Sequence, residues 1–444
     1  MPTQSPARRL GLVWLVIPVL SAAWFHLGAE VWSRARAQDA AQTPNKIVEA
    51  TPLTKEEERA FSGIGTREQN PGQLIPADAP LIEKKIKAVI AEFTMPTTTD
   101  AGPSGATKLR NDWRLKITNA SRLQFKDFHK AVNAGVIAHA TPVILDKEVN
   151  PLARVNLLML VGSLDRVERE GATPAIPLPE GTTKLVEVLK STDVPAYLQA
   201  TAIESLTRHA ELETTPQQRK EIVAAITPYL AGKRPEKYDP AGWHWLCKRS
   251  ANILQAFAEK SLPEANDPAV VAGLVTILTD ESLPYTLRID AAATIAAIDS
   301  KNLSGTNKLK EAVVGVGETA KAMATESGNP EKSLPLITHV LYMVNTLADA
   351  LRRGDGQSPT GGAKGLLAGA DANLKSPALN LHSKLTTCSD QLTKTLPKNL
   401  ADVQKAKITP AVHQPILDQL VTEVEAVIKP LRGNTVAQAP AASK

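Results

Sequence analysis

The stretch Asp280-Glu-Ser-Leu-Pro-Tyr-Thr-Leu-Arg-Ile-Asp-Ala-Ala-Ala-Thr-Ile295 decides the fold of this chain. Apolar or small residues stand three, seven, eight and eleven positions after Pro284, which is the spacing of one α-helical face. The same template starts at Asn150, Pro195 and Trp243, so the starts lie about 41 to 48 residues apart, the period of a two-helix solenoid. The template residues are Ala153, Leu157, Leu158 and Val161; Leu198, Ala202, Ile203 and Leu206; Leu246, Ser250, Ala251 and Leu254; and Leu287, Ala291, Ala292 and Ile295.

Residues 125–299 are therefore predicted to form four helical hairpins, in which the template marks each second helix. Prolines are expected to open several of the helices, because the first helical N–H has no intrahelical partner to lose. Asp267 before Pro268 adds a side chain that accepts from the first-turn amides. The predicted helix pairs are 125–140 with 151–166, 182–190 with 195–209, 216–230 with 241–259, and 268–278 with 284–298.

The second and fourth hairpins resemble the HEAT-repeat family. Asp193-Val-Pro-Ala-Tyr-Leu-Gln-Ala-Thr-Ala-Ile-Glu-Ser-Leu206 and the stretch from Asp280 to Ile295 are similar to the family's turn Asp, helix-opening Pro and Ala-rich second helix. This resemblance covers residues 125–299 and implies an armadillo-like α-solenoid that binds partners, without specifying an activity. Arg154 and Arg288 match the family's Arg position, whereas Gln199 and Cys247 depart from it and Trp243 replaces the proline.

Residues 1–37 have the features of an export signal. Arg8 and Arg9 form a charged start, an apolar run covers 10–29, and Ala35-Arg36-Ala37 offers small residues at cleavage positions. The apolar run is long for a cleaved signal, so an uncleaved N-terminal membrane anchor stays open as the alternative. Both interpretations predict an exported protein in the periplasm or cell envelope.

The rest of the chain divides by composition. Residues 38–80 contain repeated prolines and are predicted as a tether. Residues 81–124 are predicted as N-terminal helices at 81–93 and 109–120, with a loop at 94–107. Residues 300–432 lack the repeat template and are predicted as a C-terminal helical bundle that caps the solenoid, before a disordered tail at 433–444. The expected fold class is all-α.

Charge and composition restrict the function classes. The chain has 444 residues and a formal net charge of +5, but residues 1–37 hold four of the arginines and one glutamate. The remainder carries 47 basic against 45 acidic side chains, without the clustered excess of a nucleic-acid-binding protein. Aromatic residues make up only 4%, which favours closely packed helices with aliphatic cores.

No motif indicates catalysis. The sequence lacks the spaced histidine pairs of zinc enzymes, a nucleophile elbow and a phosphate-binding loop. The Gly315-Val-Gly317 motif lies in a helical pattern and is interpreted as a close-packing site. Cys247 and Cys388 belong to no metal or redox motif and are interpreted as core residues, although their pairing stays open. We therefore expect no catalytic residues, no metal and no cofactor.

One loop combines aromatic and basic side chains. The segment Lys233-Arg-Pro-Glu-Lys-Tyr-Asp-Pro-Ala-Gly-Trp-His-Trp245 joins the helices of the third hairpin. Trp, Tyr and Arg dominate binding energy at interfaces, so Arg234, Tyr238 and Trp243 are candidate partner-binding residues. The alternative is that the tryptophans pack against neighbouring helices.

These observations lead to the hypothesis of an exported, non-enzymatic scaffold that binds a protein partner, with no nucleic acid and no membrane contact beyond the N-terminal segment. Two alternatives stay open: an envelope component that acts by self-association, and an enzyme without a recognisable motif.

Overall fold

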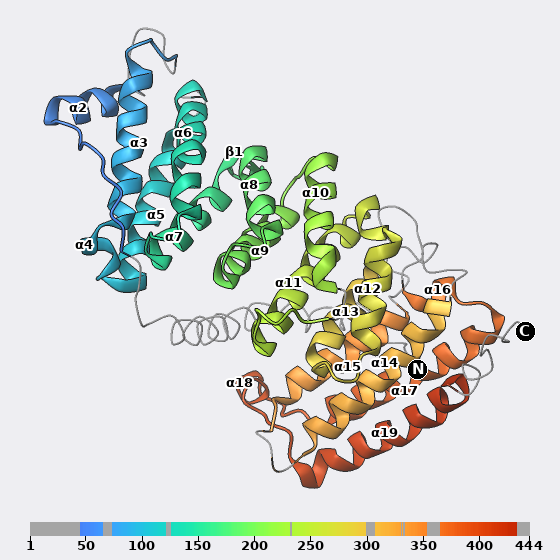
Figure 1. Cartoon of the computed structure of the whole chain (residues 1–444). Coiled ribbons are helices and arrows are strands. Elements are labelled where there is room, and N and C mark those ends of the chain that lie inside the picture. Colours follow the sequence, from blue (N-terminus) through green and yellow to red (C-terminus); the bar gives the residue numbers. More distant parts are fainter. Residues whose placement is uncertain are drawn as a thin grey trace, which may run out of the picture. The chain divides into compact units, whose positions relative to one another are not determined.

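The computed structural model describes residues 45–64, 73–120, 126–230, 233–298, 307–329, 331, 334–352 and 365–432. The expected export segment (1–37) and tail (433–444) lie outside this range. The described part is an all-α helical-repeat fold with two very short strands, β1 (Asp165–Val167) and β2 (Ile176–Pro177) (Figure 1). The all-α prediction is therefore confirmed.

The four predicted hairpins are present, with bounds close to those expected. They are α6 (Lys126–Leu145) with α7 (Pro151–Ser163), α8 (Pro179–Lys190) with α9 (Ala196–Glu211), α10 (Pro216–Ile226) and its 3₁₀ extension η3 (Thr227–Leu230) with α11 (Pro240–Glu259), and α12 (Pro268–Thr279) with α13 (Tyr285–Ala297). A further 3₁₀ turn, η4 (Pro263–Asn266), precedes α12.

The repeat template is the buried face of the second helices. Every template residue has an exposed fraction of 3% or less. The expected cap is present, since Asp267 accepts from the Ala269 amide at 2.8 Å; Asn150 also caps its helix and accepts from the Leu152 amide at 2.9 Å. The periodicity therefore identified the core of each hairpin.

A side chain at the fourth position after each equivalent start ties the second helix of a hairpin to the end of the first. The last turn of a helix leaves carbonyl groups without intrahelical partners, and these accept the bonds. Arg occupies this position twice, and Gln and Cys replace it without loss of the interaction. The bonds are Arg154 Nε to Ile144 O (2.8 Å), Gln199 Nε2 to Leu189 O (3.2 Å), Cys247 Sγ to Tyr229 O (3.0 Å) and Arg288 Nε to Leu278 O (3.0 Å).

The chain forms two compact units, and the division passes through the second hairpin. Unit 1 contains the described residues up to Thr173 together with Glu187–Ala202. Its helices form two layers: α3 (Asp78–Thr94) packs on α6, and α5 (Gly102–Ala120) packs on α7. The short helix α4 (Pro96–Thr99) joins α3 to α5, so the loop expected at 94–107 is instead largely helical. Pro96 and Pro103 stand at helix starts, where proline is tolerated.

Unit 2 contains Pro174–Val186 and the described residues from Ile203 onward. One layer stacks α12, α14 (Asn307–Ser327) and α19 (Pro410–Arg432); the other stacks α11, α13, α15 (Ile337–Leu351) and α17 (Ala372–Lys394) (Figure 1). The short helices α16 (Leu366–Gly369) and α18 (Leu400–Val403) lie in the connections. The helices of the region 300–432, expected as a bundle that caps the solenoid, thus pack on both layers of the repeat, α14 on α12 and α15 on α13.

Two glycines allow the helices of the first layer to approach closely. A Cβ at Gly315 would lie 2.9 Å from Cγ of Leu278, and one at Gly317 would lie 2.5 Å from Cγ2 of Ile428. Real Cβ atoms do not come this near to a neighbour, so a larger residue would force α12 or α19 away. This confirms the interpretation of the Gly315-Val-Gly317 motif.

The described residues of the segment expected as a tether at 38–80 pack on the helices of unit 1. Residues 45–50 are extended, and the Lys46 amide donates to Glu148 O at 2.8 Å while the Val48 amide donates to Thr94 Oγ1 at 2.9 Å. Helix α2 (Lys55–Gly63) follows, opened by a capping box of Thr54 and Glu57. In this part of the chain, the repeated prolines therefore belong to an extended segment that is bound to unit 1.

Ala291→Leu is expected to destabilise the protein by about 1–3 kcal/mol, because Ala291 is fully buried and added methyl groups overpack the core. Glu204→Ala removes one side of an exposed ion pair and should cost less than about 1 kcal/mol. Urea unfolding of both variants measures the difference. Equal losses of unfolding free energy in the two variants would contradict the assignment of the template face.

Gln199→Leu should destabilise the protein by about 1–3 kcal/mol, because Gln199 is buried and donates to both Leu189 O and Ser191 O. Gln199→Arg should retain most of the stability, since Arg fills the equivalent place in the first and fourth hairpins. Thermal unfolding of the two variants tests this order. A Gln199→Arg variant that loses as much as Gln199→Leu would show that the position does not act through its donor.

Candidate functional site

Charged and aromatic side chains lie along the second helices in unit 2; two of them are exposed and the others are half-buried. They come from α9, α11, α13 and α15, and adjacent helices of this layer pack on each other from α11 to α15. We refer to the set as the second-helix row. Its members are Glu204, Trp245, Lys248, Arg249, Asp290 and Tyr342.

One end of the row joins α9 to α11. Arg249 Nε lies 2.9 Å from Glu204 Oε2, and the guanidinium group of Arg249 lies 5.3 Å from the ring centroid of Trp245. Trp245 and Arg249 are four residues apart on α11 and so share one face of the helix. The ion pair and the cation–π contact hold both long side chains in defined positions.

The centre of the row joins α11 to α13 through Lys248 Nζ and Asp290 Oδ2, which are 2.9 Å apart. Burial raises the pKa of Asp290 and lowers that of Lys248, while the attraction between the two groups opposes both shifts. On α15, burial and the charge of Lys248 lower the pKa of His339, so its ring is neutral at neutral pH. The pair is partly desolvated, so its Coulomb attraction is less screened than that of an exposed pair, while the loss of hydration opposes the charged forms.

Tyr342 extends the row onto α15. Its side chain is 49% exposed, and burial of the hydroxyl together with the negative charge of Asp290 raises its pKa. The hydroxyl therefore stays protonated at neutral pH and can donate a hydrogen bond to a ligand. A ring held on a rigid helix offers contact area at low entropic cost.

The sequence contained a signal for this row. The sixth position after each equivalent start is polar in all four hairpins: Asn156, Thr201, Arg249 and Asp290. Arg249 and Asp290 reach from this position to Glu204 and Lys248 on the preceding second helix, whereas Asn156 and Thr201 are buried and do not belong to the row. The template was defined by apolar and small residues, so it identified the core but left out the polar residues beside it.

The structure places two of the three predicted partner-binding residues in the interior. Tyr238 and Trp243 are 4% and 3% exposed, and their ring centroids lie 5.4 Å apart. Both rings also pack on Tyr229. Arg234 is exposed, and its Nη1 donates to Tyr238 O. The rings therefore pack within the protein and do not supply exposed contact area, and binding by this loop stays a prediction for Arg234 alone.

A buried polar cluster ties together three parts of unit 1. Arg114 on α5 donates from Nη1 to Glu168 Oε1 at 2.7 Å and from Nη2 to Asp165 Oδ2 at 2.8 Å. His129 on α6 places Nε2 3.4 Å from Glu168 Oε1, and Asn133 Nδ2 donates to Asp165 O at 3.0 Å. The cluster thus fixes the segment after α7 against α5 and α6.

Glu168 is ionised in this cluster. Burial opposes its ionisation, but the hydrogen bonds from His129 and Arg114 outweigh burial and hold its pKa below the ordinary value. The side chains that pair with Glu168 all belong to unit 1, so the cluster stabilises this unit. The sequence analysis missed the cluster because its members are up to 54 residues apart.

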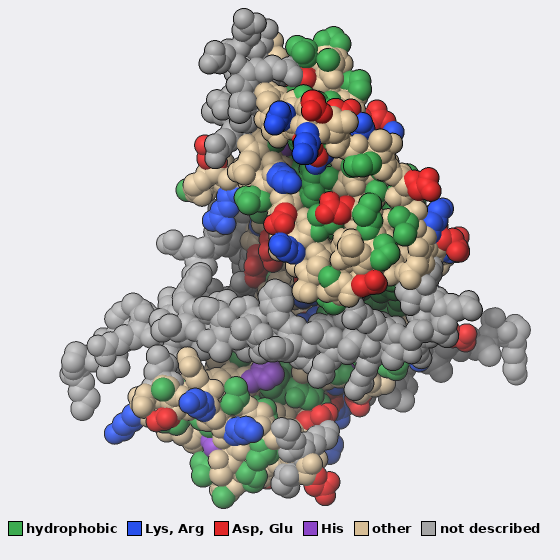
Figure 2. Space-filling view, turned by 90° about the vertical axis from the view of Figure 1, so that its left-hand side faces the viewer, with side chains coloured by type: hydrophobic (Ala, Val, Ile, Leu, Met, Phe, Trp, Pro, Cys, Tyr) green, Lys and Arg blue, Asp and Glu red, His purple; other side chains and the backbone are tan. Residues whose placement is uncertain are grey.

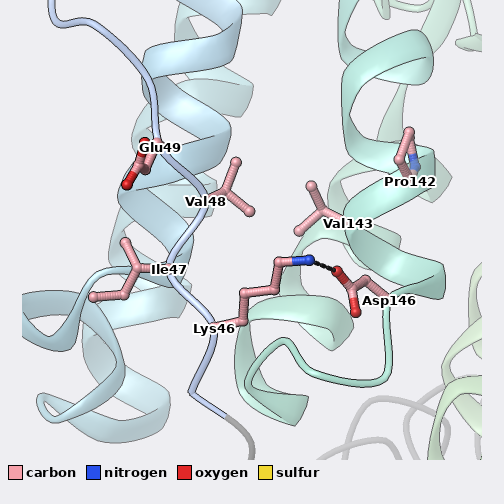
Figure 3. A pocket seen from close by; sticks show the side chains of 7 residues that line it. All are labelled: Lys46, Ile47, Val48, Glu49, Pro142, Val143 and Asp146. Carbon is pink, nitrogen blue, oxygen red and sulfur yellow. Dashed lines mark hydrogen bonds and ion pairs between the residues drawn. The ribbon is translucent and has the colours of Figure 1, made fainter.

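A shallow hollow of about 420 Å³ lies between the extended segment 45–50 and α6. Figure 3 shows Lys46 reaching across it to Asp146, with Nζ and Oδ2 2.7 Å apart, and Val48 facing Val143. The ion pair lowers the pKa of Asp146 and raises that of Lys46. The hollow is open to solvent, and its one polar end is already paired, so its residues mainly hold the segment in place.

Both cysteines are buried and unpaired. Burial raises the pKa of Cys247 and of Cys388 to about 12, so each thiol is protonated and unreactive at neutral pH. The described residues contain no group of three or more His, Cys, Asp or Glu placed to hold a metal ion.

The surface in Figure 2 carries Lys and Arg side chains interspersed with Asp and Glu, with apolar side chains between them. Such a face has no extended region of electrostatic potential of one sign. Among the described residues, no helix has both the length and the apolar composition that crossing a membrane requires.

Replacing Glu168 should change the acid stability of the protein. A pKa lowered on folding stabilises the protein above the ordinary value of about 4.3, and this contribution is lost as the pH falls through the lowered pKa. Glu168→Gln should therefore cost about 1.5–3 kcal/mol at neutral pH, and the difference from the wild type should shrink below about pH 4. Urea unfolding between pH 7 and pH 3 measures it; a difference that stays constant over this range would contradict the assignment.

No family model matches the chain, and no curated protein matches it.

Proposed function

We propose that this chain is an exported, non-enzymatic helical-repeat scaffold of the cell envelope that binds a protein partner through the second-helix row. The observation that carries the proposal is the continuity of the row over four successive second helices in unit 2. Solenoids bind partners through surfaces to which successive repeats each contribute a few side chains.

The chemistry of the row suits a protein surface. Trp, Arg and Tyr are enriched among the residues that dominate binding energy, and here they stand on helices instead of loops. The Glu204–Arg249 pair and the Lys248–Asp290 pair order the side chains before a partner arrives. Less conformational entropy is then lost on association.

Export is supported by the sequence of residues 1–37, with its arginine pair, apolar run and Ala-Arg-Ala site. The resemblance of residues 125–299 to HEAT repeats supports partner binding as the role of the fold. Neither feature names the partner, so capture from the native envelope is the direct approach.

The double variant Arg249→Ala with Tyr342→Ala should reduce partner capture by about tenfold or more, because it removes two exposed or half-exposed row residues of hot-spot type. The measurement is crosslinking and affinity capture from native envelope with the exported chain as bait, followed by quantitative mass spectrometry. Circular dichroism should show the same helix content for the variant and the wild type.

The matched control is Lys220→Ala with Glu311→Ala, which removes two exposed charged residues from α10 and α14 in the other layer of unit 2. This control should capture the partner normally. Equal losses in both double variants, or full capture by the row variant, would contradict the proposal. If the chain captures only itself and a mass measurement shows an oligomer, self-association replaces it.

A further inference from the structure

Helix α2 contacts the rest of unit 1 through ion pairs and through apolar side chains at its C-terminal end. None of its nine residues is buried. Glu57 pairs with Lys84 on α3, with Oε2 and Nζ 2.7 Å apart, and Glu58 pairs with Lys85. Phe61 packs edge-on to Phe128 of α6 at 5.4 Å between ring centroids, and Ile64 at the end of α2 is buried.

A pocket of about 200 Å³ opens between α2 and the helices on which it rests. Its apolar wall consists of the rings of Phe61, Trp113 and Phe128 with the aliphatic side chains of Ile117 and Val132. These residues come from α2, α5 and α6 in unit 1. In a chain with only 4% aromatic residues, three rings around one cavity are an unusual concentration.

The rim of the pocket is positively charged. Lys85 Nζ lies 5.8 Å from the ring centroid of Trp113, and Lys116 Nζ lies 4.9 Å from it. Glu58 is the only acidic residue of the lining, and it already pairs with Lys85. The rim therefore has one positive charge in excess, carried by the exposed side chain of Lys116.

We infer that this pocket binds a small organic carboxylate with an aromatic body. The half-buried rings of Phe61 and Phe128 take the body by offset or edge contacts, the buried Trp113 supports the wall, and Lys116 pairs with the carboxylate. The volume is below the roughly 300–1,000 Å³ of sites for drug-sized molecules, so it suits a single ring with a short acid chain. The site is in unit 1 and is independent of the second-helix row in unit 2.

The test uses 3-phenylpropanoate and its neutral amide, 3-phenylpropanamide, in isothermal titration calorimetry with the purified protein. The acid should bind at least about fivefold more tightly than the amide. Lys116→Met keeps the aliphatic stem but removes the charge, so it should abolish this preference. Phe61→Ala should weaken acid and amide alike, because it removes part of the apolar wall.

Lys130→Met is the matched control, since Lys130 is an exposed lysine of α6 that does not line the pocket. It should leave both affinities unchanged, and circular dichroism should show that all variants are folded. Absence of binding to the wild type at millimolar concentration, equal binding of acid and amide, or equal effects of Lys116→Met and Lys130→Met would each overturn the inference.

Discussion

The bond between the fourth position of each second helix and the last turn of the preceding helix is the contact on which the repeat depends. It satisfies a carbonyl that the end of a helix leaves without a partner, in a place that water does not reach. The acceptor is backbone, so the position requires a donor of suitable reach and no particular charge. Arg288, Gln199 and Cys247 all meet this requirement. This explains how the hairpin persists while the residue at its key position varies.

Small residues determine how closely the helices approach once each hairpin is closed. Ala291 and Ala292 are fully buried, and Gly315 and Gly317 admit neighbouring side chains where a Cβ would collide. The core can therefore be aliphatic and compact, and large rings are confined to a few places. Tyr229, Tyr238 and Trp243 form one such cluster in unit 2, and the pocket beneath α2 holds another in unit 1.

Charged residues serve different purposes in the two units. Arg114 and Glu168 are largely removed from solvent and hold three parts of unit 1 together. Lys248 and Asp290 form a similar, largely buried pair between α11 and α13, and their neighbours Arg249 and Tyr342 are half-buried and exposed, respectively. The same chemistry thus stabilises the fold in one unit and orders a surface in the other.

The sequence by itself determined the helical class, the four hairpins and their buried faces, because these depend on periodicity and on caps that act within a few residues, such as Asp267 before Pro268. It could not show that Tyr238 and Trp243 are buried, because their partner Tyr229 belongs to the other helix of the hairpin. Nor could it place α14 and α19 in the repeat layers, since Gly317 meets Ile428 more than a hundred residues away. The second-helix row and the pocket beneath α2 likewise join helices distant in sequence, and only tertiary packing brings such residues together.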